Sequence, residues 1–263
     1  WRRNLSDNEL SRLRTLAKSA WEEGDSFNEG IRLGFKAILL SPHFIFKVEK
    51  ESDTHDQSHR DLNAYELASR LSYFLWSSTP DDQLLAVAES GALLDAAVLE
   101  SEINRMLQDS KASALTHNFA AQWLLLRDIW NIDPEYTIYP DFDEALRDAM
   151  YQESALLFSH LLENDLPLTD LLSADYSFIN QRLATHYGLS INIPGRNYYQ
   201  INNIPNRKGF LTHSGWLGLT SNRTRTSPVK RGKWVLERLL CEAPPPPPPG
   251  VEGLIDDGTI DQN

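Results

Sequence analysis

The chain has 263 residues, of which 41% are hydrophobic and seven are tryptophan, so it is large and apolar enough to fold around a sizeable core. Its net charge of −12 argues against general nucleic-acid binding, and its single cysteine excludes an internal disulfide or a cysteine-rich metal site. No apolar run is long enough to span a bilayer, and the first residues, WRRNLSDNEL, do not resemble a signal peptide.

The first predicted module, residues 1–50, contains two helices. Ser6 and Glu9 have the spacing of a capping box, and Asp25 or Ser26 opens a second helix that Ser41 and Pro42 end. The apolar residues of the second helix recur at helical spacing, so we expect them to point inward. They are Phe27, Ile31, Phe35, Ile38 and Leu39.

Residues 60–190 are predicted to form a central helical domain. The expected helix starts are at Asn63, Thr79, Asp95 and Asp143. One continuous helix is expected from about 111 to 130, and a short turn followed by a helix is expected between 170 and 187. Each start carries a side chain that caps free amides, which is why the starts are more informative than the ends.

No metal site is predicted. Glu153 and His160 lie two turns apart on one helix face, but the Glu-x-x-His spacing of carboxylate-bridged metal bundles is absent. His55 and His59 belong to a polar segment with no apolar face, which we interpret as an exposed loop.

The C-terminal part differs in charge from the rest. Residues 189–206 read as a loop with a short strand pair at YYQIN, and the glycines of 207–221 leave helix and strand both open. We predict a basic helical segment at 205–243 and a proline-rich linker to a further domain at 244–263. Residues 207–238 carry eight basic side chains against one acidic, or +7, which leaves −19 for the remainder.

An anion-binding loop is predicted where the last helix begins. Ser227 can cap that helix and Pro228 suits its first position, with an apolar face following at Val229, Trp234, Leu236, Leu239 and Leu240. Basic residues at a helix N-terminus oppose the helix dipole, which favours an anion there. The predicted site consists of Arg223, Arg225, Thr226, Ser227, Lys230 and Arg231. In the alternative interpretation, carboxylates of the acidic body pair with these cations and the loop is a structural clamp.

These patterns together predict an all-α protein, an irregular multi-helix bundle with a proline-rich C-terminal tail. The sequence has no dinucleotide fingerprint, glycine-rich phosphate loop or catalytic triad pattern. We therefore assign no catalytic residue and leave open whether the protein is an enzyme.

Five stretches in order resemble a known set of modules: KAILLSPHFIFKVE, ELASRLSYFLWSSTPDDQLLAVAESG, NFAAQWLLLRDI, SADYSFINQRLATHYG and GFLTHSGWLGLTSNRTRTSPVKRGKWVLERLLCEAPPPPPPGV. They are similar to helical modules of unknown function from large exported planctomycete-type proteins associated with cytochrome c. The resemblance implies export to the periplasm and a downstream domain with a CxxCH haem-attachment motif. This chain has no CxxCH, so we expect no cofactor in it and haem c on that downstream domain.

Two functional hypotheses follow. In the first, the chain is a helical module of an exported c-type haem oxidoreductase or electron-transfer protein, and it positions the downstream haem domain, its basic loop holding haem propionates or an acidic substrate. In the alternative, it is a non-catalytic scaffold that binds a partner protein or a polysaccharide through aromatic residues between Trp130 and Tyr139, or at Tyr198 and Tyr199.

Overall fold

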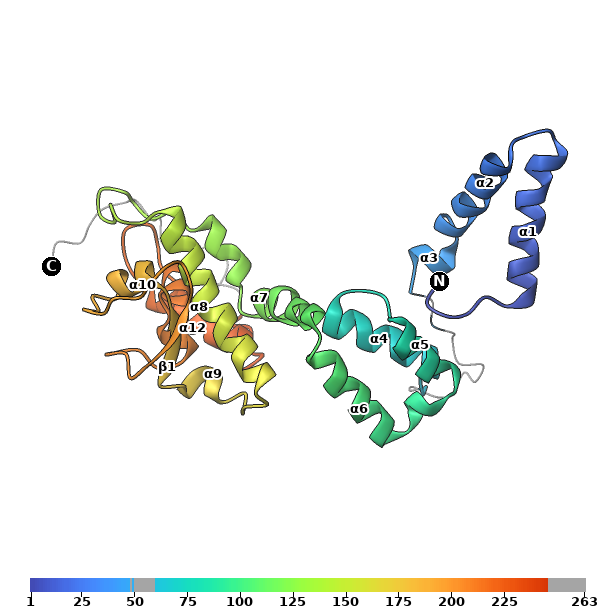
Figure 1. The fold of residues 1–263 in the computed structure, drawn as a ribbon. Helices are drawn as coiled ribbons and strands as arrows, with labels where there is room; N and C mark the ends of the chain where they lie inside the picture. Colours follow the sequence, from blue (N-terminus) through green and yellow to red (C-terminus); the bar gives the residue numbers. More distant parts are fainter. Residues whose placement is uncertain (48, 50–59, 246–263) are drawn as a thin grey trace. The chain divides into compact units, whose positions relative to one another are not determined.

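The computed structural model describes residues 1–47, 49 and 60–245, and over these residues the protein is predominantly helical, as predicted. The chain divides into two compact units, residues 1–112 and 113–263, which are coloured blue to green and green to red in Figure 1. The histidine-containing segment 50–59 and most of the predicted linker, residues 246–263, lie outside the described part of the chain.

Unit 1 begins with a helical hairpin, formed by α1 (Asp7–Glu22) and α2 (Phe27–Leu39), which run antiparallel in Figure 1. The predicted capping box is present. The amide of Glu9 donates to Ser6 Oγ, and the Glu9 carboxylate accepts from the Ser6 amide at 2.9 Å. Ser26 caps α2 in the same way, so side chains satisfy amides that have no partner inside either helix.

The prediction that the large apolar residues of α2 point inward is wrong for four of the five, and only Ile38 is half-buried. Phe27, Ile31, Phe35 and Leu39 are all exposed, and Phe27 shows 66% of its surface. The buried residue of α2 is Gly30, on the face toward α1. A Cβ added at Gly30 would lie 2.1 Å from Nε1 of Trp21, so α1 can approach this closely only where α2 has no side chain.

The rest of unit 1 is a set of short helices. They are α3 (Pro42–Ile45), α4 (Ala64–Trp76), α5 (Asp82–Glu89), η1 (Ala92–Leu94), α6 (Ala96–Leu107) and η2 (Ser110–Ala112). The starts of α4 at Asn63 and α6 at Asp95 are confirmed by their capping hydrogen bonds. The start of α5 lies two residues after the predicted Thr79, because the Asp81 carboxylate accepts from the amide of Leu84 and caps the helix.

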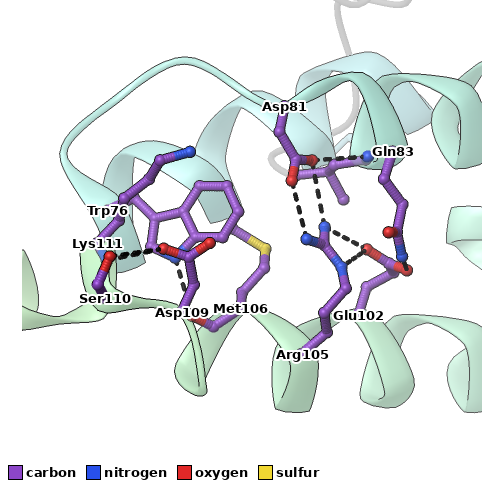
Figure 2. A network of polar contacts seen from close by, with 10 residues as sticks. Trp76, Asp81, Gln83, Glu102, Arg105, Met106, Asp109, Ser110 and Lys111 are labelled. Atoms are coloured by element: carbon purple, nitrogen blue, oxygen red, sulfur yellow. Dashed lines mark hydrogen bonds and ion pairs between the residues drawn. The ribbon is translucent and has the colours of Figure 1, made fainter.

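A polar network ties α6 to the start of α5 (Figure 2). The Arg105 guanidinium donates to Asp81 at 2.8 Å and to Glu102 at 2.7 Å, and Gln83 donates to the other oxygen of Glu102. The indole of Trp76 donates to the backbone oxygen of Met106 beside this network. Each charged group already has an opposite partner, so we interpret the cluster as a brace for unit 1.

Unit 2 is built around one long helix. Its elements are η3 (Leu115–Ala120, a π-helix), α7 (Ala121–Trp123), η4 (Leu126–Asn131), α8 (Glu144–Glu163), α9 (Asp170–Ser173), β1 (Tyr176–Ile179), α10 (Gln181–His186), β2 (Tyr199–Asn202), η5 (Phe210–Thr212), α11 (Ser214–Leu219) and α12 (Pro228–Arg238). Helix α8 contributes to two hydrophobic clusters of the unit. It begins at the predicted Asp143 cap, and α12 begins at the predicted Ser227 cap.

Three local predictions fail in unit 2. The expected helix 111–130 is broken into η2, η3, α7 and η4, with Leu125 in the left-handed conformation at φ 60°. The strand at 199–202 does not pair within its own segment but runs antiparallel to 176–179, where we expected the end of a short turn and the start of a helix. In α12, Trp234 is buried against Phe210 and Trp216, but Val229 is 78% exposed because it lies in the first turn, beyond that contact.

Candidate functional site

Unit 2 contains a pocket of about 820 Å³. One side is the loop from Asn131 to Phe142, and the other is formed by α11 and the start of α12. Apolar side chains such as Ile132, Leu217 and Met150 line much of its surface. A pocket of this size, mostly apolar with a few polar groups, is typical of small-molecule and cofactor sites.

Opposite charges line the two sides of the pocket. The acidic side carries Asp128, Asp133 and Asp141. Arg223 holds this side in place, since its guanidinium donates to the backbone oxygen of Asp133 at 3.0 Å and pairs with the carboxylates of Asp133 and Glu135. Arg223, one of the predicted anion ligands, is therefore a clamp for the loop.

Two other predicted residues form the basic side. Lys230 and Arg231 both line the pocket, and neither has a carboxylate partner among the residues that the structure describes. Lys230 donates to the backbone oxygen of Ser221 at 3.2 Å, which leaves its charge unneutralised. Arg231 lies over the ring of Trp216 at 6.0 Å, and its buried Nε has no hydrogen-bond partner in the described chain.

Of the remaining residues predicted to bind an anion, one lines the pocket and two do not. Thr226 lines the pocket and forms an isolated antiparallel bridge with Ser221. Ser227 caps α12, accepting from the amide of Lys230 at 3.3 Å, and does not line the pocket. Arg225 is exposed and also lies outside the lining. The structure thus brings Arg223, Thr226, Lys230 and Arg231 to one cavity.

A buried polar network lies under the pocket, and Ser214 connects the two. The Tyr187 hydroxyl donates to Glu153 at 2.6 Å and lies 3.0 Å from Ser214 Oγ, which lines the pocket. The other oxygen of Glu153 accepts from Ser177 at 2.7 Å. His213 completes the network, with its Nδ1 at 3.0 Å from the hydroxyl of Ser154.

Burial controls the charges in this network. Glu153 is fully buried, and burial raises the pKa of its carboxyl to about 7, although the hydroxyls of Tyr187 and Ser177 and the charge of Arg207 act in the opposite direction. Burial also lowers the pKa of His213 to about 3, with Arg207 adding to the effect. The 3.9 Å approach of Glu153 to His213 is therefore not an ion pair, since the imidazole is neutral.

Sequence reasoning missed this network, yet one signal was readable. Glu153 follows Leu146 and Met150 and precedes Leu157 at the spacing of a single helix face, and that face is apolar apart from Glu153. A carboxylate in such a position needs buried partners. The sequence around Tyr187 and His213 gave no sign that these two residues are the buried partners of Glu153.

No group of three or more metal-binding side chains occurs in the described part of the chain. Glu153 and His160, which share a helix, have different surroundings. Glu153 belongs to the buried network, and the His160 ring packs against Tyr176 and Phe178 at 5.5 and 5.1 Å. Among the described residues, no helix is both long and apolar enough to cross a membrane.

Family comparisons match the chain in three successive segments. Residues 1–49 match the PSD5 family (protein of unknown function DUF1595), 62–189 match PSD4 (DUF1592) and 207–262 match PSCyt3 (DUF1588). No curated protein and no solved structure matches the chain significantly. The resemblance seen in the sequence is confirmed: from its N-terminus onward, the chain carries DUF1595, DUF1592 and DUF1588 modules, domains of unknown function of the planctomycete cytochrome-c-associated type.

Proposed function

We propose that unit 2 is a ligand-recognition module of an exported, periplasmic c-type haem protein, and that it positions a downstream haem domain of the same protein by binding haem propionates in its pocket. The observation that carries this proposal is the basic side of the pocket, where Lys230 and Arg231 face a cavity of about 820 Å³ without carboxylate partners among the described residues. Arginine's planar group suits carboxylates, and the apolar lining suits the body of a large ligand.

The family context supports the choice of haem. The three modules are of the cytochrome-c-associated type, and this hints at a role beside haem c without establishing an activity. The chain has one cysteine, whereas covalent haem attachment through CxxCH needs two. The haem would therefore be supplied by another domain, and the residues of this chain would bind and orient it.

A titration with a haem c peptide, which carries free propionates, tests the proposal. Arg231 lies over the ring of Trp216, which packs against Trp234, so bound haem should quench the fluorescence of both tryptophans. Arg231→Gln should weaken binding at least about tenfold, since a charge-assisted hydrogen bond contributes about 1.5–3 kcal/mol. The matched control is Lys233→Gln on the same helix, because Lys233 pairs with Glu237 and lies outside the pocket.

The same peptide with its propionates esterified separates carboxylate recognition from apolar binding. We expect the ester to bind weakly to the unaltered chain. The proposal would be refuted if the acid and the ester quenched the fluorescence equally, or if Arg231→Gln and Lys233→Gln lost the same amount of binding affinity.

A second candidate, polysaccharide or protein binding by a non-catalytic scaffold, is favoured by the aromatic residues beside the pocket. Tyr136 is 71% exposed and Trp130 is 47% exposed, as sugar-stacking residues would be. Tyr198 is less suited, because its hydroxyl donates to Asp148 and fastens the loop. Retention on insoluble polysaccharide that Trp130→Ala abolishes, together with failure of the haem titration, would favour this candidate.

A further inference from the structure

We propose that the floor of the pocket is a second anion subsite, formed by Arg207 and Ser214, and that an anion bound there is accompanied by a proton taken up by Glu153. The inference rests on the proposed ligand-binding function of the pocket. It concerns residues outside the basic loop, and the ligand class is a carboxylate or another small oxyanion.

Arg207 supplies the positive charge of this subsite. Its guanidinium lies 4.1 Å from the ring centre of Tyr187 and donates to the backbone oxygen of Thr212, which fixes its position at the pocket wall. No carboxylate lies within ion-pair distance of Arg207 among the described residues. A fixed guanidinium with donors to spare is well suited to bind an oxyanion.

Ser214 supplies a hydroxyl and links the subsite to the buried acid. A continuous line of hydrogen bonds runs from Ser214 Oγ to the Tyr187 hydroxyl, 3.0 Å away, and from there to Glu153 at 2.6 Å. Glu153 itself is fully buried. The two hydroxyls therefore offer a route by which a proton can pass between the pocket and the Glu153 carboxyl.

The charges facing Glu153 predict the direction of the coupling. Its neighbours are Ser177 from β1, Tyr187 after α10, and His213 and Ser214 around the start of α11, with Arg207 contributing at longer range. His213 is neutral, so Arg207 is the positive charge that favours ionised Glu153. An anion on Arg207 cancels that charge and repels the carboxylate, and a solvent proton then neutralises Glu153.

Proton uptake can be measured directly. Calorimetric titrations with succinate and with sulfate at pH 7.5, in buffers of different ionisation enthalpy, report the protons taken up per anion. If the anion raises the pKa of Glu153 from about 7 by one unit, uptake is about half a proton. Affinity should then fall about tenfold between pH 6 and pH 9.

Three variants assign the effect. Glu153→Gln should bind the anion without proton uptake, and Arg207→Gln should lose most of the affinity. His186→Gln is the control, because His186 also lines the pocket and can titrate, and uptake should persist in it. Should Glu153→Gln not fold, Tyr187→Phe, which removes the hydroxyl next to Glu153, is expected to reduce uptake.

The outcomes separate this inference from the proposed function. Binding without proton uptake, or uptake that vanishes in His186→Gln and persists in Glu153→Gln, would overturn the inference and leave haem-propionate recognition standing. Absence of any anion or haem-peptide binding would overturn both.

Discussion

Replacing Glu153 by glutamine should change the stability of unit 2 in a way that depends on pH. The carboxyl has an ordinary pKa of 4.5, which applies to the unfolded chain, and burial raises it to about 7 in the folded protein. The folded state therefore holds this proton more tightly, and the wild-type protein loses stability as pH rises from 4.5 to 7. Glutamine has no such proton to lose.

The size of the effect follows from the two pKa values. Each pKa unit corresponds to about 1.4 kcal/mol, so the wild-type protein should lose about 3 kcal/mol of unfolding free energy relative to the variant between pH 4 and pH 8. At pH 4 the variant should be less stable by about 1 kcal/mol, because an amide replaces an oxygen that accepts from Ser177 or Tyr187. At pH 8 the order should reverse.

Hydrogen exchange of α8 peptides in increasing urea measures the stability of unit 2 apart from unit 1. His213 does not disturb the comparison, since burial lowers its pKa equally in both proteins and its effect cancels in the difference. Glu163→Gln, at the exposed end of the same helix, is the control and should change stability by less than about 0.5 kcal/mol at either pH. A difference between wild type and Glu153→Gln that stays constant from pH 4 to pH 8 would refute the reasoning.

Glycine substitutions test the close contacts of each unit. Gly30→Ala should destabilise the α1–α2 hairpin by more than about 2 kcal/mol, because a Cβ would meet Trp21. Gly34 has open space around it, so Gly34→Ala should stabilise α2 by up to about 1 kcal/mol. Urea unfolding of both variants measures whether each substitution raises or lowers the free energy of unfolding. Gly209→Ala should largely prevent unit 2 from folding, because the residue has φ 61° and its Cβ would lie 2.3 Å from the backbone of Leu172; soluble, cooperatively unfolding protein would contradict this.

The sequence predicted helix starts better than it predicted burial. Ser6, Asn63, Asp95, Asp143 and Ser227 cap helices as expected, because a capping side chain bonds to amides two or three residues away and the signal is local. Which helix face is buried depends on partners far along the chain. Apolar spacing alone could not show that α2 meets α1 through Gly30.

In the candidate site, too, local features could be predicted and contacts between distant residues could not. The basic loop could be predicted, since its cations are adjacent in sequence. The different roles of these cations could not be predicted. Arg223 clamps the loop around Asp133, which lies some ninety residues earlier, whereas Lys230 and Arg231 line the pocket. The buried network could not be assembled from sequence, because Glu153 and Ser214 come from distant elements that pack together only in the fold.

The tight contact between Gly30 and Trp21 has a consequence for how this module varies between species. A Cβ at position 30 would lie 2.6 Å from the backbone oxygen of Ala17 as well as against the ring at position 21, so a smaller ring alone would not make room, and position 30 should stay glycine among DUF1595 modules. On the exposed side of α2, the ring of Phe27 stacks on that of Trp21 at 5.2 Å, and Phe35 is 61% exposed. Aligned homologues should therefore keep glycine at 30 and an aromatic pair at 21 and 27, whereas constancy at the exposed position 35 would indicate a binding surface.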